Sequence, residues 1–259
     1  MKTSSINITG AARAAIGVPW GKFFLALLGL ALLFTSYRIY SEASAFTYGL
    51  DYFSHEFDVY WMRLLYGQLI LILALGTGTL VYLWNTRVRD FSTIGPREEV
   101  RRLFLLMGMI LLFAIMFYVT GSIYTEADAA WHQVTIRDTD FTPTHIGLFY
   151  FCVPLLVFWG FITFAYAHTR IPFFGNRISL PFAIIIAGAF MIMPNVGFNE
   201  WGHTFFYAEE LFSAPIHYGF VLLGWSTFVA GGLLVQILSR VADLTKQLVS
   251  PQAAIQTAH

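Results

Sequence analysis

Six long apolar runs constrain this chain more than any other feature of its sequence. Crossing the hydrocarbon core of a bilayer as an α-helix takes about 20 mostly apolar residues, and each run has roughly that length. We therefore expect an all-α integral membrane protein, a bundle of about six transmembrane helices. The runs are Phe23–Ile39, Trp61–Trp84, Leu103–Tyr124, Ile146–Ala167, Leu180–Val196 and Tyr218–Leu238. The fifth contains Pro194, where we expect the helix to kink or break.

The composition agrees with a membrane location. Hydrophobic residues make up 57% of the 259 residues and charged residues only 12%, which is too apolar for a water-soluble domain of this length. We expect membrane lipid, and no nucleic acid, around the chain. The single cysteine, Cys152, lies in an apolar run, so a disulfide framework and a cysteine-based metal site are excluded. We assign Cys152 to packing.

The lysine and arginine residues predict the orientation. If the six runs are threaded in order, the basic residues of the N-terminal segment, the second loop, the fourth loop and the C-terminal tail fall on one side, which the positive-inside rule makes cytoplasmic. Both termini are then cytoplasmic, and the acidic loops face the periplasm. We expect one domain, residues 1–259, with an interfacial N-terminal segment, residues 1–20, and a flexible tail, residues 247–259.

One cytoplasmic loop carries a helix-start signal. Pro96 follows Gly95, and Glu98 and Glu99 come within the next turn, a pattern typical of a first helical turn. We interpret the surrounding segment, residues 87–103, as a solvated cap that fixes the topology.

A polar window on the outer side contains three possible metal ligands. Asp128 and His132 are four residues apart, so they share a helical face if the third helix continues past Tyr124. His145 follows thirteen residues after His132, at a helix start marked by Pro143. Two histidines and one carboxylate leave coordination positions open, the arrangement that suits a metal reacting with oxygen.

A second window repeats this layout with an amide in place of the carboxylate. Asn199 and His203 are four residues apart, and His217 follows fourteen residues later, two positions after Pro215. An amide oxygen is a neutral and weaker ligand than a carboxylate. We therefore expect this second site to hold its metal less tightly.

Other polar residues near the windows are alternatives. Asp138 and Asp140 compete with Asp128 as ligand, although a loop positions a ligand less rigidly than a helix, and Asp140 or Thr142 is expected to cap the fourth helix. Four glutamates are candidates for moving protons or orienting the imidazoles: Glu126, Glu200, Glu209 and Glu210. Three histidines have no partner at ligand spacing: His55, His168 and His259. The spacing does not select a metal, since iron and zinc suit this ligand set as well as copper does.

Several long stretches resemble one protein family. They are "TEADAAWHQVTIRDTDFTPTH", "TRIPFFGNRISLPF" and "MPNVGFNEWGHTFFYAEELFSAPIHYGF", and the likeness runs from "GLDYFSHEFDVYWM" to "HYGFVLLGW". In these stretches the chain is similar to the C subunit of the copper membrane monooxygenases, the family of particulate methane monooxygenase and ammonia monooxygenase.

The resemblance implies a complex of A, B and C subunits, assembled as a trimer of heterotrimers in a bacterial inner or intracytoplasmic membrane. Such a complex inserts one atom of O2 into ammonia, methane or a short alkane and releases the other as water, with a membrane quinol as the expected electron donor. Family copper ligands correspond to two sets of residues, Asp128, His132 and His145 in the first window and Asn199, His203 and His217 in the second. We expect the first set to be catalytic and the chain to be inactive alone.

Two other functions stay open. The chain could be a structural subunit whose metal only stabilises the complex, with catalysis in a partner, or it could be a metal or proton transporter. A transporter carries ionisable residues midway through its spans, and apart from Arg63 these runs contain almost none. The segments "AWHQV" and "ELFSAP" look slightly more like the ammonia-oxidising branch, with methane and short alkanes nearly level.

Overall fold

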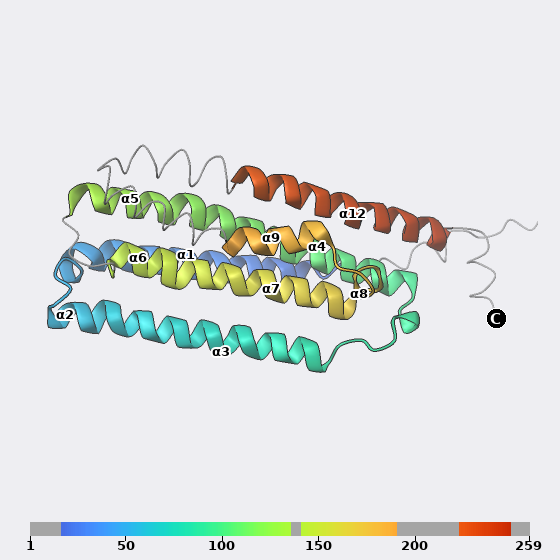
Figure 1. Ribbon diagram of the computed structural model, residues 1–259, viewed down its shortest axis with the longest axis horizontal. Coiled ribbons are helices and arrows are strands. Elements are labelled where there is room, and N and C mark those ends of the chain that lie inside the picture. The colour runs from blue at the N-terminus through green and yellow to red at the C-terminus, as the bar shows by residue number, and fades with distance from the viewer. Residues whose placement is uncertain (1–16, 136–140, 191–222, 250–259) are drawn as a thin grey trace, which may run out of the picture.

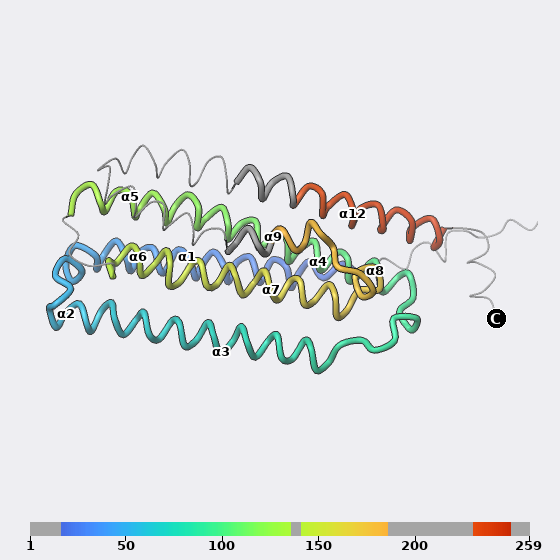
Figure 2. The backbone as a smooth tube through the Cα atoms, in the orientation of Figure 1, coloured from blue at the N-terminus to red at the C-terminus, as the bar shows by residue number. Residues whose placement is uncertain are grey.

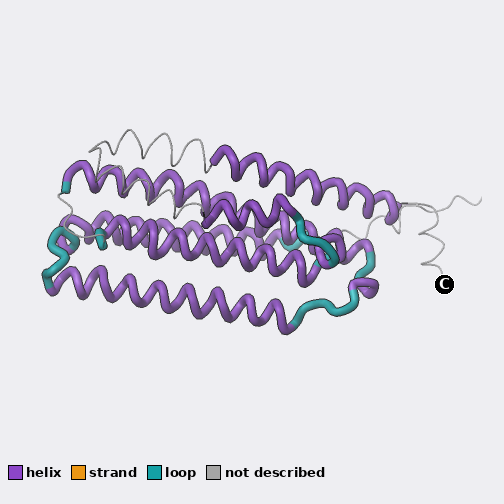
Figure 3. The backbone as a smooth tube through the Cα atoms, in the orientation of Figure 1, coloured by secondary structure: helices purple, strands orange, loops and turns teal. Residues whose placement is uncertain are grey.

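The computed structural model describes residues 17–135, 141–190 and 223–249, and within these ranges every regular element is a helix (Figure 3). The long helices run side by side along the longest axis of the molecule (Figure 1, Figure 2). The predicted all-α fold is therefore confirmed for the described part of the chain.

Four continuous helical stretches are long and apolar enough to cross a membrane. They are Trp20–Tyr48 (α1), His55–Asn85, Pro96–Val134 and Pro143–Arg170. The second stretch consists of His55–Phe57 (α2), Asp58–Met62 (η1) and Arg63–Asn85 (α3). The third stretch consists of Pro96–Val119 (α4), Thr120–Tyr124 (η3) and Thr125–Val134 (α5). The fourth stretch consists of Pro143–Gly147 (α6), Leu148–Cys152 (η4) and Val153–Arg170 (α7). The first four predicted runs fall inside these stretches. Each helix continues beyond its run because an apolar run marks only the part suited to hydrocarbon.

The last two predicted runs overlap α9 (Leu180–Phe190) and α12 (Leu223–Val249). The remainder of the fifth run, with Pro194, lies outside the described residues, as do residues 1–16, 136–140, 191–222 and 250–259. The count of six helices and the cytoplasmic termini therefore stay predictions. α12 continues through Val249, so the first residues of the predicted flexible tail are helical.

The elements η1, η3 and η4 are π turns, in which each hydrogen-bonded ring takes in one more residue than in an α-helix. They lie inside helices that are otherwise α-helical on both sides. η3 and η4 contact each other. Gly147, just before η4, also lets the ring of Tyr37 on α1 approach, since a Cβ on Gly147 would lie only 3.2 Å from Cε1 of Tyr37.

The core forms around α7, which packs against α3, α4 and α9. α3 comes close to α7 at Gly76, where a Cβ would overlap the ring of Phe158. Cys152 is fully buried in this core, which agrees with its assignment to packing. The two short elements η2 (Phe91–Thr93) and α8 (Pro172–Gly175) contact each other at the end of the bundle opposite α5 and α6 (Figure 1).

The start of α4 confirms one prediction and corrects another. Gly95 precedes the helix, Pro96 begins it, and Glu98 and Glu99 lie in its first turn, as predicted. The interpretation of this segment as a solvated cap is wrong for Glu99, which is only 2% exposed. Its carboxylate pairs with the guanidinium of Arg240 on α12 at 2.8 Å. The sequence pattern around Glu99 could not indicate this contact, because the partner lies 141 positions away.

Candidate metal centre

α5 carries two of the predicted ligands. The helix that begins at Pro96 continues through η3 into α5, as the spacing of Asp128 and His132 required. Nδ1 of His132 lies 2.9 Å from the main-chain oxygen of Asp128, one turn earlier. An N–H at Nδ1 donates to this carbonyl and leaves the Nε2 lone pair available for a metal ion.

His145 comes from the first turn of α6. Thr142 caps this helix, because its hydroxyl accepts a hydrogen bond from the main-chain N–H of His145 at 3.1 Å. Pro143 follows at the first position of the helix. Thr142 was one of the two predicted caps, and the bond holds the main chain of His145 itself.

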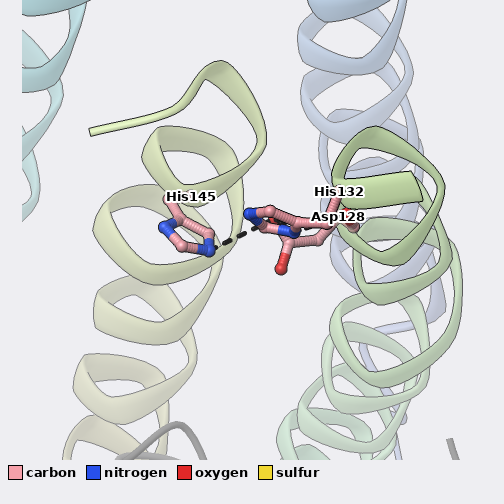
Figure 4. Close-up of side chains that lie close together, drawn as sticks. All are labelled: Asp128, His132 and His145. Atoms are coloured by element: carbon pink, nitrogen blue, oxygen red, sulfur yellow. Dashed lines mark hydrogen bonds and ion pairs between the residues drawn. The ribbon is translucent and has the colours of Figure 1, made fainter. Parts of the chain in front are cut away.

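The three side chains converge from two neighbouring helices (Figure 4). Oδ1 of Asp128 lies 3.5 Å from Nε2 of His145 and 3.6 Å from Nδ1 of His132. One ligand atom from each residue lies within 4.8 Å of the others. Nitrogen and oxygen atoms bound to one ion at about 2.0–2.2 Å stand roughly 3–4 Å apart. The distance between Asp128 and His145 therefore fits two ligands of one ion, and His132 completes a group of three residues that could hold a metal.

The charge balance also favours a cation at this position. Asp128 is 5% exposed, and a buried carboxylate is costly unless a positive group lies beside it. Within the described ranges its ion pairs are with His132 and His145, which carry charge only when protonated. A bound metal ion would supply the positive charge while both imidazoles stay neutral and act as ligands.

Two aromatic side chains neighbour the candidate ligands, Phe149 in space and Trp131 in sequence. The ring of Phe149 lies 5.0 Å from the ring of His145. Trp131, next to His132 in sequence, is 5% exposed and packs with Phe46 at 4.9 Å. Trp131 is therefore part of a core cluster of buried residues.

Comparison with known proteins gives the family. The sequence profile of one family, the C subunit of ammonia monooxygenase/methane monooxygenase, matches residues 9–248. The chain belongs to this family. No individual curated protein matches it. The match confirms the resemblance seen in the sequence, and the chain is one subunit of a membrane monooxygenase.

The second predicted site of this C subunit lies outside the described residues. It consists of Asn199, His203 and His217. Asp138 and Asp140 also lie outside the described ranges, as do Glu200, Glu209, Glu210 and His259. Their predicted roles therefore stay predictions.

Three other predicted residues are described and are not members of the candidate metal group. Glu126 is exposed on α5, and His55 is exposed at the first position of α2. His168 lies in the last turn of α7, where its ring stacks on Phe164 at 3.9 Å. None of the three belongs to the Asp128 group.

Sequence reasoning missed one buried hydrogen-bonded pair beside the three candidate ligands of the C subunit. The hydroxyl of Tyr37 donates to Oε1 of Gln68 at 3.0 Å, and Nε2 of Gln68 donates to the main-chain oxygen of Ile146 at 3.0 Å. Ile146 directly follows His145. The available signal was a lone glutamine inside an apolar run, since a polar side chain there needs a partner.

Proposed function

We propose that this C subunit holds copper with Asp128, His132 and His145, and that this site takes part in the O2-dependent reaction of the complex. The observation that carries the proposal is the convergence of one buried carboxylate and two imidazoles in a member of the ammonia and methane monooxygenase family. Copper also stands above iron and zinc in the affinity order for such ligands. When bound and reduced, copper supplies an electron to O2.

The side chains divide the work of building such a site. Asp128 contributes the negative charge that compensates a cation away from bulk water. His132 and His145 contribute neutral nitrogen donors, and the carbonyl that accepts from Nδ1 of His132 fixes the orientation of that ring. Three protein ligands leave positions open for a small molecule.

The finer points of the function belong to the same proposal. The substrate is ammonia, methane or a short alkane, and one oxygen atom of O2 enters it. A second and weaker copper site consists of Asn199, His203 and His217. The complex contains A and B subunits as a trimer of heterotrimers, receives electrons from a quinol, and sits in a bacterial inner membrane with the metal sites on the periplasmic side.

The alternative is a structural role, in which the metal only stabilises the ends of α5 and α6 and the chemistry occurs in a partner subunit. Copper content and turnover, measured together on the same variant, separate the two roles. Offering ammonia, methane and butane separately to isolated membranes identifies the substrate by its product.

We expect His132→Ala to remove one copper ion from each copy of the chain and to abolish turnover while the complex still assembles. His132 supplies one of three ligands and lies on α5, outside the hydrophobic cluster around α7. Metal analysis and oxygenase assays of the purified complex are the measurements. His55→Ala is the matched control, because His55 is exposed and outside the ligand group, and it should keep both copper and activity. Full copper in His132→Ala would refute the proposed site, and lost copper with intact turnover would leave only the structural role.

A further inference from the structure

We propose that Gln68 is a positioning residue for the copper site, acting on His145 through the main chain of Ile146. The inference rests on the proposed function, because it concerns a site that the proposal assigns to copper. The two hydrogen bonds of Gln68 are to Tyr37 and to the main chain of Ile146, and neither is to a ligand side chain. We expect Gln68 to affect the position in which the first turn of α6 holds the imidazole of His145.

The hydrogen bonds of Gln68 use both ends of its amide. Nε2 donates to the carbonyl of Ile146 and Oε1 accepts from the hydroxyl of Tyr37, both at 3.0 Å. Gln68 is 8% exposed and Tyr37 is 9% exposed, so water cannot replace a lost partner easily. An amide satisfied at both ends in a buried position holds a single orientation. The pair therefore ties α1 and α3 to the residue that follows His145.

The hydrogen bond from Gln68 to Ile146 lies close to both His145 and η4 along the chain. Ile146 lies two residues before η4, and the ring of Tyr37 stacks on Phe151 inside η4 at 4.2 Å. A π turn interrupts the regular α-helical pairing of carbonyls with N–H groups. The side-chain N–H of Gln68, bound two residues before η4 begins, fixes the main-chain position of Ile146 at this end of the turn.

The other two π turns are bound in a similar way. At η1 the hydroxyl of Tyr40 donates to the carbonyl of Tyr60 at 2.6 Å, and at η3 the hydroxyl of Thr125 donates to the carbonyl of Thr120 at 3.0 Å. Only at η4 is the bound carbonyl adjacent in sequence to a proposed metal ligand. Among the three donors, Gln68 is thus the one placed to act on the metal centre through the main chain.

Gln68→Leu tests the inference, because leucine has a similar volume and cannot form either hydrogen bond. The measurements are the copper affinity of the purified complex, from competition with a chelator, and the electron paramagnetic resonance spectrum of its Cu(II). Loss of a group that orients a metal ligand typically weakens metal binding about 10–100-fold, and we expect a change in this range with an altered spectrum. Tyr37→Phe keeps the ring stacked on Phe151 and removes one bond, so it should give a smaller change in the same direction.

Gln236→Leu is the matched control. It removes another glutamine hydrogen bond, from the hydroxyl of Ser179 to Oε1 of Gln236 at 2.9 Å, between the segment before α9 and α12. We expect wild-type copper affinity and spectrum in this variant. Wild-type affinity and spectrum in an assembled Gln68→Leu complex would overturn the inference. If Gln68→Leu does not assemble, wild-type values for both measurements in Tyr37→Phe would overturn it.

The same series separates this inference from the proposed function. If His132→Ala and the wild type hold equal copper, the copper site itself is refuted. If His132→Ala loses copper and the Gln68 and Tyr37 variants behave like the wild type, only the positioning role fails.

Discussion

The carboxylate of Asp128 gives its site a property that the amide of Asn199 cannot reproduce. A carboxylate places a full negative charge in direct contact with a bound cation, whereas an amide offers only a dipole. At a position as buried as that of Asp128 this difference in charge compensation is large, because a poorly compensated ion is costly away from water. The two proposed sites should therefore differ in how they release copper.

We expect the Asn199, His203 and His217 site to lose copper first when a chelator is added stepwise. Metal content after each step, compared between Asp128→Ala and Asn199→Ala complexes, identifies the site that empties. The Asn199→Ala complex should lack the early phase of release, and the Asp128→Ala complex should lack the late phase. Early release that persists in Asn199→Ala would contradict the ranking.

The spacing of residues predicted that Asp128, His132 and His145 would lie together, but not the hydrogen bonds that support them. Asp128 and His132 were predictable because residues four apart share a helical face, and Pro143 marked where the helix of His145 begins. Gln68 was not, since its partners lie 31 and 78 positions away. A hydrogen bond between distant segments leaves no periodic pattern in the sequence.

At the scale of the helix, the cap of α6 links local sequence to the metal centre. Thr142 accepts a hydrogen bond from the N–H of His145, so the same residue that starts the helix fixes the main chain of a ligand. Caps of this kind contribute about 1 kcal/mol. Because the capped N–H belongs to His145, part of this stabilisation would contribute to the free energy of copper binding.

Thr142→Ala should therefore weaken copper binding by up to about tenfold, which corresponds to about 1.4 kcal/mol, because the first turn of α6 would lose its side-chain acceptor. Chelator competition on the assembled complex measures the change. Thr142→Ser keeps the hydroxyl and should bind copper as the wild type does. Equal affinities in the alanine and serine variants would show that the cap does not act on the metal centre.

The hydrophobic runs predicted the four helical stretches that are long and apolar enough to cross a membrane. They did not predict the π turns inside three of these stretches. A run of apolar residues marks the length of a span, and it looks the same whether the helix inside it is regular or widened. The turns η3 and η4 contact each other, and the ring of Tyr37 on α1 stacks on Phe151 inside η4. Such contacts exist only in the folded bundle.

At the scale of the whole molecule, the pair of Glu99 and Arg240 joins α12 to α4. Two hydrogen bonds connect the carboxylate and the guanidinium, at 2.8 and 2.9 Å. The carboxylate side is buried and the guanidinium side is partly exposed. The ring of Phe173 lies 5.9 Å from this guanidinium, so the pair also reaches the segment around α8.

We expect Glu99→Ala to lower the free energy of unfolding by about 1.5–3 kcal/mol, the range for hydrogen bonds to charged groups. Thermal denaturation of the purified complex in lipid should show a lower midpoint. Asp243→Ala is the control, because Asp243 and its partner Lys246 are both exposed and 3.9 Å apart, and such pairs contribute little. Equal midpoints in the two variants would show that the buried pair does not hold α12.

The two π turns beside the candidate metal centre also affect how the chain length can vary. A π turn takes one more residue than an α-helical turn, so η3 and η4 each hold one extra residue between two α-helical parts. Deleting one residue from 120–124 or 148–152 would cost the span only about 1.5 Å of length, which lipid can accommodate. The shortened segment can return to regular α-helix, because the widened turn holds the residue in excess, and the direction of Asp128 and His132, or of His145, changes little. A deletion in a regular part of the same helix has no such outlet and rotates the ligand-bearing turn by about 100°.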